Sequence, residues 1–155
     1  MAQAIQALLA FLALPGLVAF LLPALFARSA PRPSGLAFLG LVPFGLGVVG
    51  LLMCVREFYV RGRGTLAPWA PPKHLVTTGL YRHSRNPMYV SVLLILAGWG
   101  VLFERPALWV YAGVVAVAFH IRVVVAEEPW QQREFGAEWT DYKARVPRWL
   151  GRGRS

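Results

Sequence analysis

Two polar segments of this 155-residue chain hold the side chains best suited to chemistry. The first, residues 74–89, reads HLVTTGLYRHSRNPMY and combines histidine, arginine, asparagine and tyrosine. The second, residues 127–149, reads EEPWQQREFGAEWTDYKARVPRW and begins with two glutamates. Long apolar runs precede both segments. Polar groups beside bilayer-sized apolar runs predict a site at a membrane surface, where a water-soluble cofactor meets a lipid-like substrate.

The first segment has the residues of an anion site. Asn86 suits the N-cap of a helix and Pro87 its first position, so the helix would begin there. Its free N–H groups and positive dipole end would then attract a carboxylate or a phosphate, and Arg85 adds charge. Tyr81 and Tyr89 offer aromatic faces to a cation or a flat base. The alternative is an interfacial belt, because Arg and Tyr also gather at headgroup depth in membrane proteins.

The second segment follows an apolar run that itself contains polar residues. Glu127 and Glu128 stand at the edge of this run, where carboxylates are costly unless they are paired or functional. His120 lies seven residues before Glu127, which predicts that the two share a helix face. Arg122 could hold an anionic group of a substrate, or it could extend to the membrane surface. The candidate catalytic residues are therefore Arg122, His120 and Glu127.

Residues 131–143 have the pattern of an amphipathic helix. Phe135, Trp139 and Tyr142 recur at helical spacing on one side, with charged residues elsewhere. Such a helix would either lie on the membrane or cover the site. The 3 histidines and 1 cysteine have no metal-ligand spacing, so we expect no metal.

Four apolar runs must position these groups. The chain is 57% hydrophobic and only 15% charged, with a mean hydropathy of +0.51, which predicts an all-α integral membrane protein with a single domain over residues 1–155. Pro15 and Pro23 should kink the first run, and Gly47 and Gly50 should allow a close helix contact in the second. Three residues separate the last two runs, so these should form a tight antiparallel hairpin. The expected spans are residues 4–27, 35–55, 87–103 and 107–126.

The charge distribution predicts the orientation of the spans. Of the 16 Lys and Arg residues, 13 lie in residues 56–86 or from residue 122 onward, and the other 3 are Arg28, Arg32 and Arg105. The positive-inside rule then places residues 56–86 and 127–155 in the cytoplasm, at the inner membrane if the source is bacterial. The net charge of +9 favours anionic lipid headgroups as partners, since no nucleic-acid motif is present. We expect residues 4–27 to be a retained span and not a signal peptide.

The ordered motifs resemble those of the isoprenylcysteine carboxyl methyltransferase family and its phospholipid methyltransferase relatives. The match covers about half of the chain, although Asn86 stands where many members have histidine. The motifs that carry it are His74-Leu75-Val76, Gly79-Leu80-Tyr81, Arg85-Asn86-Pro87-Met88-Tyr89, Glu127-Glu128, Phe135-Gly136, Tyr142 and Val146-Pro147.

The resemblance implies S-adenosylmethionine as the methyl donor. The acceptor would be hydrophobic, either lipid-like or prenylcysteine-like. A carboxylate acceptor needs no base and would be positioned by Arg122, whereas an amine or thiol would need His120 or Glu127 as the base. The cofactor-site residues carried over by position are His74, Leu75, Val76, Gly79, Tyr81, Arg85, Asn86, Pro87, Tyr89, Glu127 and Glu128.

Two other functional classes stay open at this point. A membrane reductase resembling the NADPH-dependent sterol reductases would use a comparable cytoplasmic site, although this chain is short for one. A non-catalytic membrane module would bind no adenosyl ligand tightly. The sequence does not determine the oligomeric state.

Overall fold

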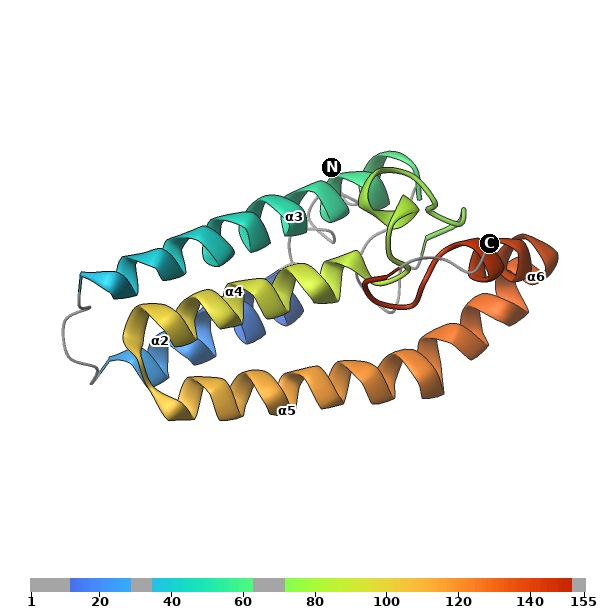
Figure 1. Ribbon diagram of the computed structural model, residues 1–155. Coiled ribbons are helices and arrows are strands. Elements are labelled where there is room, and N and C mark those ends of the chain that lie inside the picture. Colours follow the sequence, from blue (N-terminus) through green and yellow to red (C-terminus); the bar gives the residue numbers. More distant parts are fainter. Residues whose placement is uncertain (1–11, 29–34, 63–71, 152–155) are drawn as a thin grey trace.

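The computed structural model describes residues 12–28, 35–62 and 72–151, and this part of the chain consists of helices and connecting loops (Figure 1). The all-α prediction is therefore confirmed for these residues. The helices are η1 (Leu12–Leu21), α2 (Leu22–Ala27), η2 (Leu36–Gly40), α3 (Leu41–Val60), η3 (Gly79–Arg82), α4 (Pro87–Phe103), α5 (Pro106–Arg122), η4 (Val123–Glu127) and α6 (Glu128–Arg145).

Two of the helical stretches, Leu36–Val60 and Pro106–Arg145, are long and apolar enough to cross a membrane. Pro15–Ala27 and Pro87–Phe103 are shorter apolar helices. The third expected span agrees with α4 at both ends, because Pro87 begins it and Glu104 ends it with a left-handed backbone (φ 50°). The second continues past Val55 to Val60, and the start of the first, residues 4–11, lies outside the described residues.

The α3–α4 contact is built on glycines. A Cβ atom on Gly47 would lie 2.6 Å from the Ser91 backbone oxygen, and one on Gly98 would lie 2.6 Å from the Phe44 Cβ. The backbones can approach this closely only because these side chains are missing. Leu51, Val92, Ile95 and Leu96 complete a buried core beside them. The expected glycine contact in the second span is thus made within the chain.

The first helical segment is irregular, and its neighbours compensate for this. Pro23 has no N–H to donate to the Ala19 carbonyl, which would be its partner in a regular α-helix. The Trp99 indole N–H donates to this oxygen instead, at 2.9 Å. The Tyr111 hydroxyl donates to the adjacent Val18 carbonyl, also at 2.9 Å. Side chains of α4 and α5 therefore satisfy the carbonyl that Pro23 leaves free and the carbonyl next to it.

The helix continues beyond Ala126, the expected end of the fourth span, since α5, η4 and α6 follow one another without a break. The end of the span itself stays a prediction. Gly136 kinks α6 with a backbone that only glycine adopts readily (φ 50°, ψ −115°). Beyond this kink, Trp139 and Tyr142 are buried together with Val146, and Leu75 packs against them. The aromatic side of residues 131–143 thus packs on protein, so this helix covers the first polar segment.

Both polar segments lie at the same end of the helix bundle (Figure 1). At this end η3 and the start of α4 face α6 and the segment that follows it. The opposite end holds the tight α4–α5 connection, as expected for a hairpin. The cytoplasmic orientation of the polar end stays a prediction.

Candidate active site

The two polar segments bind one another through backbone and side-chain contacts. The Arg85 N–H donates to the Pro147 carbonyl at 2.9 Å, and the Asn86 side-chain amide donates to the Arg148 carbonyl at 3.0 Å. Arg85 also donates from Nη1 to the Glu128 carboxylate at 2.8 Å. Residues more than 40 positions apart in the sequence therefore form one site, as the motifs predict.

A cavity of about 580 Å³ lies where the segments meet. Its polar wall includes Arg85, Asn86 and Glu127, and its apolar wall includes Val92 and Phe119. The volume lies within the range of about 300–1,000 Å³ that is typical of small-molecule sites. The other lining residues are Pro15, Val18, Phe58, Pro72, Tyr81, Met88, Tyr89, Arg122, Val125, Ala126, Pro129, Trp130, Gln131 and Arg133.

Tyr89, Arg122 and Glu127 form a hydrogen-bonded cluster in the cavity wall. Arg122 Nε donates to a Glu127 carboxylate oxygen at 2.7 Å and to the Tyr89 hydroxyl at 3.1 Å. The Tyr89 hydroxyl donates to the same Glu127 oxygen. The Phe119 ring lies against Tyr89, with 4.3 Å between ring centroids. The cluster thus presents a carboxylate, a guanidinium and an aromatic face to one space.

The wide turn η4 explains why Arg122 meets Glu127. A π-helical turn joins residue i to residue i+5, whereas a regular α-helix brings i and i+4 together. Arg122 and Glu127 are five residues apart, since η4 begins directly after Arg122 and ends at Glu127. The prediction that His120 and Glu127 share a face assumed a regular helix. The structure differs, because Glu127 contacts Arg122 and Tyr89 while the exposed His120 stacks on Trp149.

Glu128 is occupied by two guanidinium groups. It accepts from Arg85 at 2.8 Å and from Arg148 at 2.7 and 2.9 Å. Burial opposes ionisation of Glu128, but the bonds from Arg148 and the charge of Arg85 outweigh burial and lower its pKa. The bond to Glu128 raises the pKa of Arg148, and burial lowers that of Arg85. The Arg85 guanidinium also lies 5.4 Å from the Trp139 ring centroid. Glu128 does not line the cavity, so this glutamate binds protein.

Asn86 occupies the N-cap position, but its side chain makes no capping bond. Its amide instead binds the Arg148 carbonyl, and its own backbone N–H donates to the Ser84 hydroxyl at 3.1 Å. Asn86 therefore joins the two polar segments in addition to beginning α4. Pro87 is buried at the first position of α4, as expected.

Tyr81 lines the cavity from η3 and is almost fully buried. Its carbonyl accepts from the Tyr142 hydroxyl at 2.7 Å, which ties η3 to α6. Burial raises the pKa of Tyr81 well above its ordinary value, so this phenol stays neutral. Its ring lies 5.5 Å from that of Phe58.

Several predicted residues position the site from outside the cavity wall. Val76 is buried beside Tyr81, and Leu75 packs on the aromatic residues of α6. Gly79 has φ 60°, and a Cβ there would lie 3.1 Å from the Glu57 side chain, which also accepts a bond from Thr78. These contacts hold residues 74–79 against α3. His74 itself is exposed.

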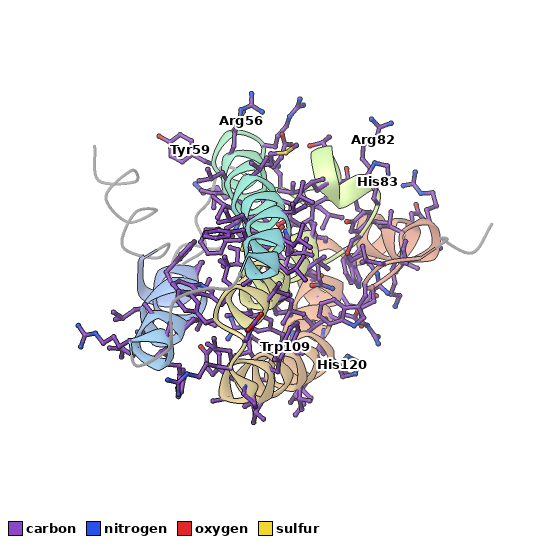
Figure 2. The ribbon with its side chains drawn as sticks, turned by 60° about the vertical axis from the view of Figure 1, so that its left-hand side comes forward. Arg56, Tyr59, Arg82, His83, Trp109 and His120 are labelled. Atoms are coloured by element: carbon purple, nitrogen blue, oxygen red, sulfur yellow. The ribbon has the colours of Figure 1, made fainter. Side chains whose placement is uncertain are left out.

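Two basic residues of the first segment face away from the cavity. Arg82 and His83 project outward from η3, and both are exposed (Figure 2). His120 is likewise exposed on α5 and does not line the cavity (Figure 2). The positive charge inside the cavity therefore comes from Arg85, Arg122 and a third residue, Arg133.

Sequence analysis missed the cavity residues from α6 and from the first helix. Trp130, Gln131 and Arg133 line it from α6, directly after the glutamate pair. Pro15 and Val18 line it from η1, and Pro15 lies inside this irregular helix. The proline was the available signal, because irregular backbone at membrane depth often lines a cavity.

Comparisons with known proteins agree with the motifs. Residues 37–138 match the family model described as phospholipid methyltransferase. The nickel-cobalt-cadmium resistance protein NccN of Alcaligenes xylosoxydans xylosoxydans is 30% identical over 77% of this chain and 51% of its own length. The cobalt-zinc-cadmium resistance protein CzcN of Cupriavidus metallidurans is 32% identical over 74% of this chain and 48% of its own length.

A third relative is shorter. An uncharacterized protein of Haemophilus influenzae is 32% identical over 41% of this chain and 100% of its own length. This chain thus spans about half the length of the two resistance proteins that it matches. No solved structure matches it.

Proposed function

The chain belongs to the phospholipid methyltransferase family, and we propose that it transfers the methyl group of S-adenosylmethionine to a lipid-like acceptor at the cytoplasmic face of a membrane. The observation that carries this proposal is the cavity between the two polar segments. It joins a charged wall to an apolar wall within one space of about 580 Å³. A polar donor and a hydrophobic acceptor need such a combination in order to meet.

The chemical groups of the cavity fit the donor. S-adenosylmethionine supplies an electrophilic methyl group on a sulfonium, and it also carries a carboxylate, an ammonium, ribose hydroxyls and adenine. Arg85 and the start of α4 suit the carboxylate. Glu127 suits a hydroxyl or a cationic group, and Tyr89 and Trp130 offer faces to the adenine or the sulfonium. Glu128 is held by two arginines, so we assign ligand binding to Glu127.

The charge balance favours a carboxylate acceptor over an amine. Among the described residues, four charged side chains line the cavity: the cations Arg85, Arg122 and Arg133 and the anion Glu127. The donor adds a further net positive charge. An anionic acceptor would compensate this excess, whereas a cationic amine would increase it. The acceptor class we propose is therefore a hydrophobic carboxylic acid, with prenylcysteine-like acids included.

The residues then have separate tasks. Arg122 uses Nε for its bonds to Glu127 and Tyr89, and its terminal nitrogens would bind the acceptor carboxylate. One carboxylate oxygen forms a bond to the methyl carbon as the bond from that carbon to sulfur breaks, and the sulfonium becomes a neutral thioether. No proton moves, so the protein's contribution is alignment and exclusion of water, which is worth roughly 7–11 kcal/mol in favourable cases. For an amine or thiol acceptor, the candidate bases are Glu127, which lines the cavity, and His120, which lies outside its wall.

The apolar wall would receive the tail of the acceptor. Val92, Phe119 and Val125 lie on α4, α5 and η4, and Pro15 and Val18 come from the first helix. Val125 is 70% exposed, so this side of the cavity reaches the surface of the apolar bundle. A hydrophobic chain could therefore enter from the lipid while its polar end reaches Arg122.

The names of NccN and CzcN connect those proteins with metal resistance. Among the described residues there is no group of three or more His, Cys, Asp or Glu side chains placed to hold a metal ion. We therefore propose methyl transfer, and not metal binding, for the cavity.

The test is methyl transfer by the purified protein in detergent. The donor would be S-adenosylmethionine with a labelled methyl group, and the acceptors would be an acid, an amine and a thiol with the same hydrophobic tail. We expect the acid to give a methyl ester, identified by mass spectrometry. The amine as preferred substrate would contradict the acceptor class and retain the enzyme class. NADPH oxidation without methyl transfer, or absence of S-adenosylhomocysteine binding by calorimetry, would overturn the proposal.

A further inference from the structure

The segment after α6, residues 146–150, crosses the start of α4 (Figure 1). Val146 leaves the helix with an extended backbone (φ −114°, ψ 128°), and the chain turns back toward η3. The family match ends at residue 138, so this segment lies outside the matched region. We call residues 146–150 the tail strap.

The backbone of the tail strap binds two consecutive cavity residues. The Pro147 carbonyl accepts from the Arg85 N–H at 2.9 Å. The Arg148 carbonyl accepts from the Asn86 amide at 3.0 Å and from the Ser84 hydroxyl at 3.4 Å. The path of the strap thus sets the position of the residues that open α4.

The side chains of the tail strap contact α5 and α6. Arg148 donates to both carboxylate oxygens of Glu128, at 2.7 and 2.9 Å. Trp149 stacks on His120 with 6.1 Å between ring centroids and lies 6.5 Å from the Tyr89 ring. The strap therefore connects α4 with α5 and α6, although neither Arg148 nor Trp149 lines the cavity.

We propose that Arg148 is a positioning residue for the methyl donor, an inference that rests on the proposed function. Glu128 Oε1 accepts from both Arg85 and Arg148, so Arg148 shares the carboxylate that would otherwise draw Arg85 out of the cavity. The Nε atom of Arg85 is buried and has no hydrogen-bond partner among the described residues. Arg148 thereby keeps Arg85 and Asn86 facing the ligand without touching it.

The test compares three arginine variants in detergent. R148A removes the guanidinium, R148K keeps the charge but not the two-pronged geometry, and R145A is the matched control. Arg145 is exposed, and its one hydrogen bond to a described residue is within its own helix, to the Asp141 carbonyl at 3.2 Å. The measurements are S-adenosylhomocysteine binding by calorimetry, KM for the donor, kcat and thermal unfolding.

We expect R148A to weaken S-adenosylhomocysteine binding and to raise KM for the donor by about tenfold, with a smaller change in kcat, because misplacement by about 1 Å is costly. R148K should fall between R148A and the wild type, and R145A should match the wild type. Thermal unfolding separates this effect from general destabilisation, since a purely structural role would lower the unfolding temperature and leave binding by the folded protein unchanged.

The failures of the two proposals are distinguishable. Wild-type affinity in folded R148A would overturn the positioning role and leave the methyltransferase proposal in place. Absence of binding by the wild type and R145A alike would overturn both. If R148A does not fold, R148K decides, and wild-type affinity in that variant would count against the positioning role.

Discussion

Helix α4 takes part in two different kinds of contact. Its middle packs on α3, where Gly47 and Gly98 allow backbone to meet side chain without space between them. Its first turn faces η4 and α6, where charged side chains surround a cavity of about 580 Å³. One helix therefore contributes to a closed apolar region and to an open region that combines charged and apolar side chains.

The difference follows from what each neighbour of α4 presents. The facing residues of α3 are small or aliphatic, and tight packing of such groups stabilises the fold through dispersion and burial. At the other contact, η4 widens the helix and turns Glu127 toward Tyr89 and Arg122. The cavity lies between this charged cluster and the apolar wall that includes Val92 and Phe119. The contacts that stabilise the fold and the proposed ligand site thus lie at different parts of the same helix.

The largest expected effect comes from filling the closed region. Gly47→Leu would place a branched side chain where even a Cβ comes within 2.6 Å of the Ser91 backbone oxygen. We expect a loss of more than about 3 kcal/mol in the free energy of unfolding, so the protein should fail to accumulate or should melt at a much lower temperature.

The control for this variant is two residues away. A Cβ on Gly45 meets nothing within 4 Å, so Gly45→Leu should be tolerated. Thermal unfolding in detergent compares the two directly. Equal unfolding temperatures for Gly47→Leu and Gly45→Leu would show that the α3–α4 contact is not the rigid part of the fold.

The second prediction concerns the open region, where a substitution should lower activity and leave stability nearly unchanged. Arg122→Ala removes the guanidinium proposed to hold the acceptor, so kcat/KM for a carboxylic acid should fall by about 100-fold, or roughly 2.7 kcal/mol. The Arg122 side chain is 50% exposed, and ion pairs of this kind add little stability, so the unfolding temperature should barely change.

The exposed Arg82 on η3 provides the matched control for this loss of activity. Arg82→Ala should retain activity, because this side chain projects away from the cavity (Figure 2). Arg122→Lys should recover part of the activity by keeping the charge. Unchanged turnover in a folded Arg122→Ala variant would remove Arg122 from the mechanism.

The closed region could be predicted from the sequence better than the open one. Pro87 and Glu104 bracket α4, and the predicted third span has the same bounds as the helix. Gly47 predicted a close helix contact, because a residue without a side chain lets two backbones approach at its own position. Helix α3 continues five residues beyond Val55, the expected end of the second span, and Glu57 in this extension accepts a bond from Thr78.

The open region depended on information that local patterns do not contain. The motifs identified Asn86 and Glu127, but the wide turn η4 changed which residues share a face, so Glu127 contacts Arg122 and not His120. The role of Glu128 depends on Arg148, twenty residues later, and only the folded tail brings them together. The motifs therefore predicted which segments meet, but not the partners of each charge.

The smallest expected effect is a loss of stability at low pH, and it tests whether the contact of Arg85 and Arg148 with Glu128 depends on the charge of this carboxylate. The pKa of Glu128 lies below its ordinary value because the bonds from Arg148 and the charge of Arg85 outweigh burial. Its contribution to stability is then complete above the unfolded pKa of about 4.3 and is lost as the pH falls through the lower folded pKa. We expect the free energy of unfolding of the wild type to fall by on the order of 1 kcal/mol on acidification from pH 5.

Glu128→Gln should remove this part of the pH dependence, whereas Gln in place of the exposed Glu138 should not. Equal acid sensitivity in the wild type and Glu128→Gln would mean that Arg85 and Arg148 do not depend on this carboxylate, and the polar contact would then be as insensitive to pH as the glycine contact.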